Sequence, residues 1–353
     1  MRPRKPLVTA ILSVHNGEAH VRKALNALLA QSYEALEILV IDDGSWDGTP
    51  EALRACRDRR LRVITHAERR GLTASLSEGL AEARGTWIAR LDADDFCHPD
   101  RIRLQMATAL ARPDCVLVSS ACAVRDEVGR TSSVVRPSVW PSVISWQLTF
   151  VNPIAHSSVL FDRERALRSG GYDLCQTYAQ DYDLWCRLRA EGEICVLPVV
   201  LTTLCKHPGQ IWSVHRAAAV ASALAIVRRN VEREFGIEAD ADTLGLLHGV
   251  RTERIYDVRA TRRSLDLLER VTRRAAQGMH SDAERLDVYG LLVGHLREMG
   301  SLAGPQGRLC AKFGLQAGWQ LLGRKMLADW GTFSLGLTYG RALRASVGRW
   351  SPR

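Results

Sequence analysis

Three carboxylates stand within four residues where the segment WIARLDADDF, Trp87 to Phe96, leaves a short apolar run. Asp92, Asp94 and Asp95 are close enough along the chain for their charges to repel one another. A bound cation, a raised pKa on one of the three, or plain exposure to water makes such a cluster tolerable. The spacing therefore marks a candidate metal or acid–base site and leaves these three explanations open.

Polar residues also end two earlier apolar runs, since Ser13, His15 and Asn16 close the first and Asp43 follows the second. We expect strands at residues 7–14, 36–41, 61–65 and 86–91, with helices at 18–31, up to residue 56, and at 72–83. Strands that alternate with helices of this length predict βαβ units and a parallel sheet. Ligands bind at the carboxyl ends of such strands, which is where these polar side chains fall.

Two common phosphate-binding motifs are absent from the sequence. A G-x-G-x-x-G fingerprint would follow the first strand, where this chain has SVHNGE, and no G-x-x-x-x-G-K-[ST] loop occurs. What remains is a nucleotide-type sheet whose strand ends carry carboxylates in place of glycines.

Four parts of the sequence stand in a telling order: VTAILSVHNGE, LEILVIDDGSWDGT, ARGTWIARLDADDFCHPDRI and the pair NPIAHSSVLFDRERALRSGGYD with AQDYDLWCRL. Together they resemble the inverting family 2 glycosyltransferases with the GT-A fold, and the likeness covers residues 5–215. The resemblance implies a nucleotide-diphosphate sugar as donor. Two positions depart from the family pattern: His15 stands where Tyr is frequent, and Gln180 precedes Asp181 where Glu is usual.

The resemblance also implies roles for the acidic cluster and the strand ends. Asp94 would be the more direct ligand of Mg²⁺ or Mn²⁺, with Asp92 near the ribose or the ion, because these ions take oxygen ligands and stabilise a departing diphosphate. Asp95 would cap the next segment or orient a ligand water. The donor-binding residues would be Ser13, His15, Asn16, Asp43, Arg70 and Asp92. For Asp43 a turn-forming role, and for Arg70 an exposed surface role, are the structural alternatives.

An inverting transfer is a single displacement and requires a general base for the acceptor hydroxyl. Asp181 occupies the family's base position, and a first-turn helix aspartate is the structural alternative, a part that Asp183 would fill equally well. His156, Asp183 and Trp185 are candidates for the acceptor side. For His156 a purely structural role is an equal alternative.

Composition sets the remaining expectations. The chain has 353 residues, of which 46% are hydrophobic and 25% charged, and a net charge of +9 that favours an anionic partner. Its nine cysteines show no C-x-x-C pair, so we expect a cytoplasmic protein. We expect a catalytic domain at residues 1–211 and a helical domain at residues 212–353.

The segment from Ser301 to the end holds eight Lys and Arg against one acidic residue, with Trp319, Trp330, Phe333, Tyr339 and Trp350 among them. Such a tail suits either the anionic cytoplasmic face of a membrane or an aromatic helical core, and the two stay open.

Two other functions fit less well. A nucleotidyltransferase would carry a Gly-rich, basic loop after the first strand, and a nucleic-acid-binding protein would interleave its basic residues with aromatics near the motifs. A processive synthase would have spanning helices and a Q-x-x-R-W sequence, and neither occurs. We therefore expect transfer of a sugar to a saccharide or lipid-linked acceptor of the cell envelope, and no nucleic acid as partner.

Overall fold

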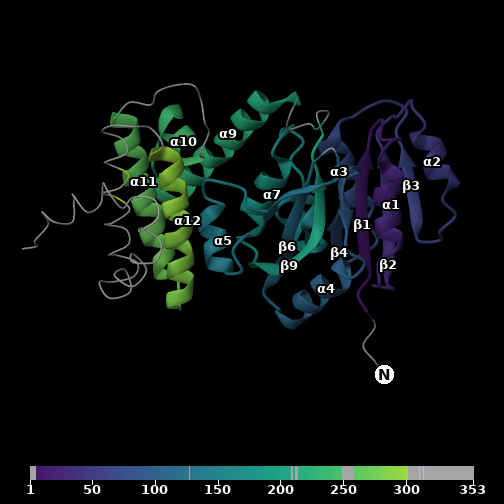
Figure 1. Cartoon of the computed structure of the whole chain (residues 1–353), viewed down its shortest axis with the longest axis horizontal. Helices are drawn as coiled ribbons and strands as arrows, with labels where there is room; N and C mark the ends of the chain where they lie inside the picture. The colour runs from purple at the N-terminus through teal and green to yellow at the C-terminus, as the bar shows by residue number, and fades with distance from the viewer. Residues whose placement is uncertain are drawn as a thin grey trace, which may run out of the picture. The chain divides into compact units, whose positions relative to one another are not determined.

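The computed structural model of the chain describes residues 5–126, 128–207, 210, 214–248, 258–300, 310 and 313. It divides into two compact units, Met1–Asn230 and Val231–Arg353 (Figure 1). The boundary expected after residue 211 falls beside residues 211–213, which lie outside the described residues. The division into units falls after Asn230, within a long helix.

The first half of the sheet is parallel and consists of the four strands that the alternating pattern predicts. They are β1 (Val8–Val14), β2 (Leu36–Asp42), β3 (Leu61–Thr65) and β4 (Trp87–Arg90). They lie in the order β3-β2-β1-β4. β1 and β2 are buried at every residue, which explains why their sequences are almost continuously apolar. This order brings the carboxyl ends of β1, β2 and β4 to one edge.

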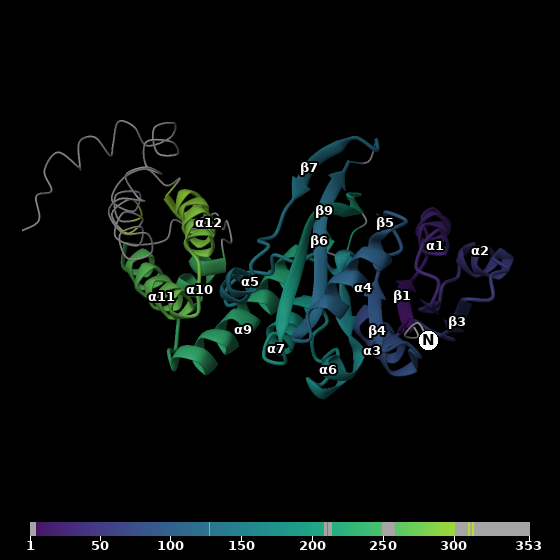
Figure 2. The same cartoon turned by 90° about the horizontal axis from the view of Figure 1, so that it is seen from below.

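The second half of the sheet, which has nine strands within the described residues, is mixed. It consists of β5 (Phe96–Cys97), β6 (Cys115–Arg125), β7 (Thr131–Val135), β8 (Leu160–Asp162) and β9 (Glu193–Cys205). β8 is antiparallel to both β4 and β6, and β6 is parallel to β9 and carries β7 as a hairpin partner (Figure 2). β5 follows the acidic cluster directly and pairs with the end of β9. That pairing brings the segment after β9 to the cluster.

Helices cover both faces of this sheet. They are α1 (Val21–Leu29), α2 (Thr49–Ala55), α3 (Leu72–Glu82), α4 (Arg101–Ala111), α5 (Pro141–Gln147), α6 (Arg163–Arg168) and α7 (Gln180–Leu188), with a 3₁₀ turn η1 (His156–Ser158). α1 packs Val21, Ala24, Leu25 and Leu28 onto the strands at helical spacing. α6 begins at Asp162, whose side chain accepts a hydrogen bond from the backbone N–H of Arg165.

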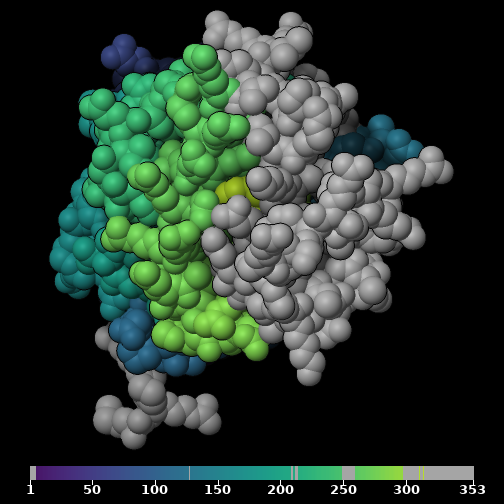
Figure 3. Space-filling model, turned by 90° about the vertical axis from the view of Figure 1, so that its left-hand side faces the viewer, coloured from purple at the N-terminus to yellow at the C-terminus, as the bar shows by residue number. Residues whose placement is uncertain are grey.

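The helical unit follows α9 (Arg216–Phe235), which spans the division between the units. Its other described helices are α10 (Ala241–His248), α11 (Val258–Gln277) and α12 (Asp282–Gly300), whose residues run from green to yellow-green in Figure 3. α11 is amphipathic, because it buries Leu265, Leu268 and Val271 and exposes its arginines. Within the described residues, no helix is both long and apolar enough to span a bilayer. The basic segment after Ser301, except Cys310 and Phe313, lies outside the described residues.

Candidate active site

The loops after β1 and β2 are tied together by hydrogen bonds. The imidazole Nδ1–H of His15 donates to the backbone carbonyl of Asp43 at 2.8 Å, and this hydrogen bond places a ring proton on Nδ1. The backbone N–H of Asn16 donates to Ser45 Oγ at 2.9 Å, and Trp46 donates its N–H to the Asn16 side chain at 3.0 Å. Asn16 adopts a positive φ of 50°, which its short polar side chain tolerates. These bonds hold His15 and Asn16 at the carboxyl edge of the sheet, beside the nearly buried Ser13.

Asp43 is enclosed and its carboxylate is heavily used. Its side chain accepts from the backbone N–H groups of Arg70 and Gly71 and from His66, each at 2.8 Å. Burial alone would raise the pKa of Asp43, but these hydrogen bonds outweigh it and the pKa is lowered. The side chain is only 3% exposed. In this conformation Asp43 therefore anchors the loop before α3, and any contact with a base has to use its remaining lone pair.

Arg70 stands at the rim of this loop. Its guanidinium is 55% exposed and forms a 3.3 Å ion pair with Glu78, which also contacts His66 at 2.8 Å. The Asp43 carboxylate fixes the backbone of Arg70. The Arg70 side chain is free to move, since an exposed ion pair contributes little to stability. This arrangement is compatible with a contact to a bound anion.

Asp92 is held from two sides. Its Oδ1 pairs with Arg90, a fully buried arginine, and its Oδ2 accepts from the hydroxyl of Ser157 at 2.8 Å. Burial would raise the pKa of Asp92, but the Arg90 charge and the Ser157 bond keep it below the usual value. Asp92 is therefore an ionised carboxylate of fixed orientation.

Asp94 contacts a residue that no sequence pattern pairs with it. The Nε2 atom of His207, just after β9, lies 2.9 Å from Asp94 Oδ2, and Gln210 reaches the same oxygen at 3.4 Å. The imidazole of His20 stacks on that of His207 with ring centroids 5.3 Å apart. The only signal for His207 in the sequence is a histidine directly after a strand.

Asp95 lies inside the protein, behind the other two carboxylates. It is 4% exposed and accepts from the backbone N–H of Cys205 at 2.9 Å. Burial raises the pKa of Asp95 well above its usual value, and the charges of Asp92 and Asp94 add to the rise. Asp95 thus fixes the end of β9, two residues before His207, rather than capping the helix that follows.

The cluster offers donor atoms and negative charge that suit a divalent cation. Asp94 and His207 already converge, and a cation there would offset the charges that act on Asp95. Within the described residues no three His, Cys, Asp or Glu side chains converge as a metal site. An ion held by two side chains keeps open positions for other oxygen ligands, as in sites that bind phosphates.

Asp181 opens α7 and faces the carboxylates of the sheet edge. Its Oδ2 accepts from the side-chain amide of Asn152 at 3.0 Å. Burial raises the pKa of Asp181 to about 6, and the charge of Asp92 contributes to the rise. A carboxyl group with such a pKa is ionised at neutral pH and is still basic enough to take a proton.

Of the residues predicted for the acceptor side, only His156 lies at this edge. Its Nε2 is 2.9 Å from the hydroxyl of Tyr172, and burial lowers its pKa to about 3, so the ring is neutral. Trp185 has no exposed surface and packs on Phe161 and His156. It belongs to the core, which corrects the prediction of an acceptor contact.

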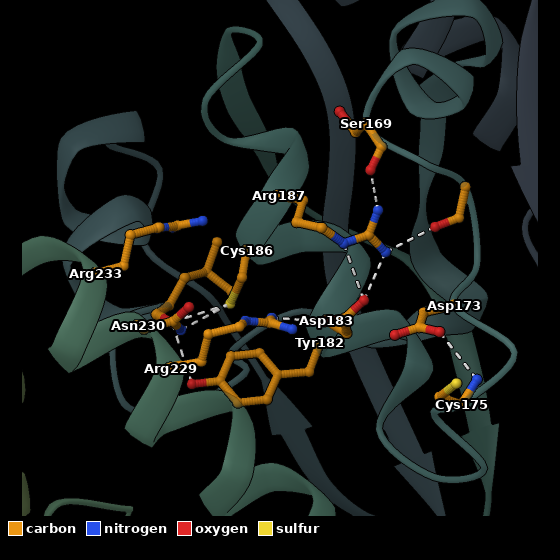
Figure 4. A network of polar contacts seen from close by, with 12 residues as sticks. Ser169, Asp173, Cys175, Tyr182, Asp183, Cys186, Arg187, Arg229, Asn230 and Arg233 are labelled. Atoms are coloured by element: carbon orange, nitrogen blue, oxygen red, sulfur yellow. Dashed lines mark hydrogen bonds and ion pairs between the residues drawn. The ribbon is translucent and has the colours of Figure 1, made fainter.

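Asp183 is also placed differently from the prediction. Its carboxylate has no exposure and lies between Arg187 and Arg229, at 2.6 Å from each (Figure 4). A carboxylate enclosed by two guanidinium groups reaches neither solvent nor an acceptor. Asp183 is therefore no alternative base in this structure.

Comparison with known proteins identifies the domain that carries these residues. Residues 9–149 match the model of glycosyl transferase family 2. The chain carries a family 2 glycosyltransferase domain. It is similar to an uncharacterized glycosyltransferase of Haemophilus influenzae, with 28% identity over 64% of this chain and 73% of that protein. It is also similar to the amylovoran biosynthesis glycosyltransferase AmsE of Erwinia amylovora, with 28% identity over 55% of this chain and 74% of that protein.

A solved structure supports the fold of the glycosyltransferase domain. The mannosyltransferase PcManGT from Pyrobaculum calidifontis, solved with GDP-Man and Mn²⁺, aligns with a TM-score of 0.50 and 20% identity, over 91% of this chain and 88% of that one. The mixed sheet with helices on both faces is GT-A-like, as the resemblance implied, and a helical region follows it. The strand ends that carry Asp43 and Asp92 thus lie within the residues that match the family model and have this fold.

Proposed function

We propose that the chain is an inverting glycosyltransferase that transfers a sugar from a nucleotide-diphosphate sugar to a saccharide or lipid-linked acceptor. One observation carries the proposal: Asp181, with a pKa raised to about 6, lies close enough to Asp92 for the two charges to interact. A basic carboxyl group and a donor-side carboxylate therefore share one edge of the sheet. In an inverting transfer the base lies on the side of the attacking hydroxyl, while the departing diphosphate and the groups that bind the donor lie on the other side of the reacting carbon.

The donor would lie along the ends of β1, β2 and β4. His15 and Asn16 border the base, Ser13 lines the floor, and Asp43 sets the loop that carries Arg70. Asp92, held by Arg90 and Ser157, would accept hydrogen bonds from the ribose or contact the ion. The exposed guanidinium of Arg70 would reach a phosphate, because Arg matches phosphate geometry and is not locked in its present pair.

Asp94 and His207 would hold the divalent ion, with Asp92 nearby. When bound, Mg²⁺ or Mn²⁺ supplies Lewis-acid stabilisation of the departing diphosphate. A carboxylate paired with an imidazole suits Mn²⁺ better than Mg²⁺, since Mg²⁺ is usually held through oxygen ligands and water. The likeness to a mannosyltransferase solved with Mn²⁺ agrees with this choice.

Asp181 would remove the proton from the acceptor hydroxyl as its oxygen attacks the anomeric carbon. The bond from that carbon to the diphosphate oxygen breaks in the same step, so the configuration inverts and the proton remains on Asp181. The Asn152 amide holds the carboxylate oxygen in place, and His156 with Tyr172 lines the acceptor side. No covalent nucleophile is needed.

Two further features support the proposed acceptor class and location. A relative named for amylovoran biosynthesis favours a role in cell-envelope or extracellular polysaccharide synthesis. Nucleotide sugars are cytoplasmic donors, so we propose a cytoplasmic enzyme that docks on the membrane face where a lipid-linked acceptor would be found. The basic segment after Ser301 is the element proposed to dock there.

The decisive experiment combines a donor panel with a stereochemical readout. Purified protein is incubated with UDP-, GDP- and dTDP-sugars, with Mn²⁺ or with excess EDTA, and nucleotide release is measured before acceptors are tried. We expect one donor to be used, activity to require the ion, and the product to show the opposite anomeric configuration by NMR. Retention of configuration, or full activity in EDTA, would overturn the proposal.

A further inference from the structure

A buried ion cluster lies two residues beyond the proposed base on the same helix. Asp183 is fully buried and bound by Arg187 of α7 and by Arg229 of α9, each at 2.6 Å (Figure 4). Only the carboxylate is fully buried, because the side chains of Arg187 and Arg229 keep 21% and 39% of their surface exposed. Taking this carboxylate out of water is costly, so it requires the two cations beside it, and the pairs fix the orientation of Asp183.

The start of α7 lacks the usual means of fixing a helix terminus. Its N-cap residue, Ala179, has a left-handed φ of 57° and offers no side-chain cap. A non-glycine residue in this region is strained and persists only where its surroundings hold it. The first turn, which carries Asp181, must therefore be positioned by contacts from elsewhere.

Three consecutive residues of this turn supply those contacts. Asp181 accepts from Asn152, the hydroxyl of Tyr182 donates to the backbone carbonyl of Leu148 at 3.1 Å, and Asp183 binds Arg229. The first two contacts are hydrogen bonds from neutral donors, whereas the third brings opposite charges within 2.6 Å of each other, with the carboxylate fully buried. Arg229 thus supplies a charged contact from outside α7 to the turn that bears the base.

Arg187 extends the cluster toward the acceptor side. Besides binding Asp183, it donates to the backbone carbonyls of Ser169 and Gly171, the latter at 2.7 Å. Gly171 directly precedes Tyr172, whose hydroxyl contacts His156. One carboxylate therefore orders both the base-bearing turn and the segment that leads to Tyr172.

We infer that Arg229, acting through Asp183, is a positioning residue for the base Asp181. The inference rests on the proposed function. Arg229 lies on α9, the helix that runs on into the helical unit, so the base is anchored to a helix outside the GT-A sheet. Misplacing a reacting group by about 1 Å costs about a hundredfold in rate, so loss of this anchor should act on turnover.

The test compares Arg229→Met with Arg229→Lys and with a matched control at the next residue. Asn230 is fully buried and bonds to Leu148 and Cys186, but it does not touch Asp183 (Figure 4). Asn230→Leu therefore weakens the same helix contact without breaking the ion cluster. All proteins are assayed well below the lowest unfolding midpoint, with saturating acceptor.

We expect Arg229→Met to lower kcat by about 10- to 100-fold while the donor KM stays within about twofold of wild type. The kcat of Arg229→Lys should lie between those of wild type and Arg229→Met, because lysine keeps the positive charge but lacks the planar guanidinium group. Asn230→Leu should lose thermal stability and keep kcat. Should Arg229→Met fail to fold, a wild-type kcat in Arg229→Lys overturns the inference.

Equal losses of kcat in Arg229→Met and Asn230→Leu would also overturn it, since they would indicate general loosening. These outcomes differ from a failure of the proposed function. In that case the wild-type protein itself would transfer no sugar from any donor.

Discussion

Individual carboxyl groups in this site have opposite pKa shifts, and the shifts separate their roles. Backbone N–H groups and His66 keep Asp43 ionised despite its burial, whereas Asp181 has few donors and its pKa is raised to about 6. Residues whose surroundings push their pKa values apart are the usual acid, base and charge-bearing members of an active site. Asp43 therefore fits a fixed anchor and Asp181 a proton acceptor.

Replacing the base is the first residue-scale prediction. Asp181→Asn should keep donor affinity and lower kcat by about 10²–10⁴-fold, which is the usual contribution of a general base. The folded pKa of Asp181 lies above its unfolded value, so the ionised group destabilises the fold as pH rises from about 4 to about 6. At pH 7.5 the variant should thus unfold no earlier than wild type, which serves as the control in a thermal melt. Wild-type turnover would reduce Asp181 to a structural residue of α7.

The second residue-scale prediction concerns the pH dependence of the rate. Because only ionised Asp181 accepts a proton, kcat/KM for the acceptor should rise tenfold per pH unit below about 6 and level off above it. A rate series from pH 4.5 to 8 at saturating donor and Mn²⁺ measures this limb. A limb that persists unchanged in the residual activity of Asp181→Asn would assign it to another group.

At the scale of elements, the order of apolar runs along the sequence predicted the parallel strands of the site. It did not predict the short antiparallel strands that complete the site. β1, β2 and β4 are apolar runs separated by amphipathic helices, so their pairing and the clustering of Asp43 with Asp92 follow from known rules. β8 has three residues, and no local pattern places it between β4 and β6. His207 and Asp94 are 113 residues apart, and β5 and β9 bring them together through a two-residue pairing. Short antiparallel pairs depend on tertiary packing, which local periodicity does not encode.

The next prediction concerns the loop before α3, which Asp43 anchors. Gly44 has a φ of +68°, and a Cβ there would lie 2.6 Å from the backbone carbon of Glu68. Gly44→Ala should therefore strain both its own turn and the loop before α3, lowering stability by about 2–4 kcal/mol and weakening donor binding. Gly129 is the matched control, because its φ is +80° but a Cβ there meets nothing within 4 Å.

Denaturant titration and nucleotide-sugar binding compare the two variants. Gly129→Ala should lose only about 1–2 kcal/mol of stability, which is the cost of a left-handed backbone for a residue with a Cβ. It should bind donor as wild type does. Equal losses of stability with unchanged donor binding in both would show that the Gly44 contact has no consequence for the site.

The charge of the whole molecule is concentrated in its helical half. Eight Lys and Arg against one Asp after residue 300 account for most of the net +9. α11 adds an exposed face of six arginines, namely Arg259, Arg262, Arg263, Arg270, Arg273 and Arg274. Three of them form ion pairs or backbone contacts: Arg263 with Asp240, Arg273 with Glu269, and Arg274 with the carbonyl of Glu234. The other three point to solvent without an ion pair within the described residues, which is the form a surface for anionic lipid takes.

The last prediction is that this half brings the enzyme to an anionic membrane. Each Arg or Lys near such a surface contributes about 1 kcal/mol, so each one lost should weaken binding about fivefold. Co-sedimentation with vesicles of phosphatidylglycerol or of phosphatidylcholine alone compares full-length protein, a chain ending at Gly300, and the triple variant Arg259→Glu, Arg262→Glu, Arg270→Glu. A control reverses Arg57, Arg59 and Arg136, which are exposed on the catalytic unit. Binding should require the anionic lipid and should weaken with salt, because salt screens the electrostatic attraction. It should fall in the chain ending at Gly300 and in the triple variant, and it should stay unchanged in the control. Equal binding by all four proteins, or by none, would leave the basic residues as a solvated surface and the tail aromatics as part of a helical core.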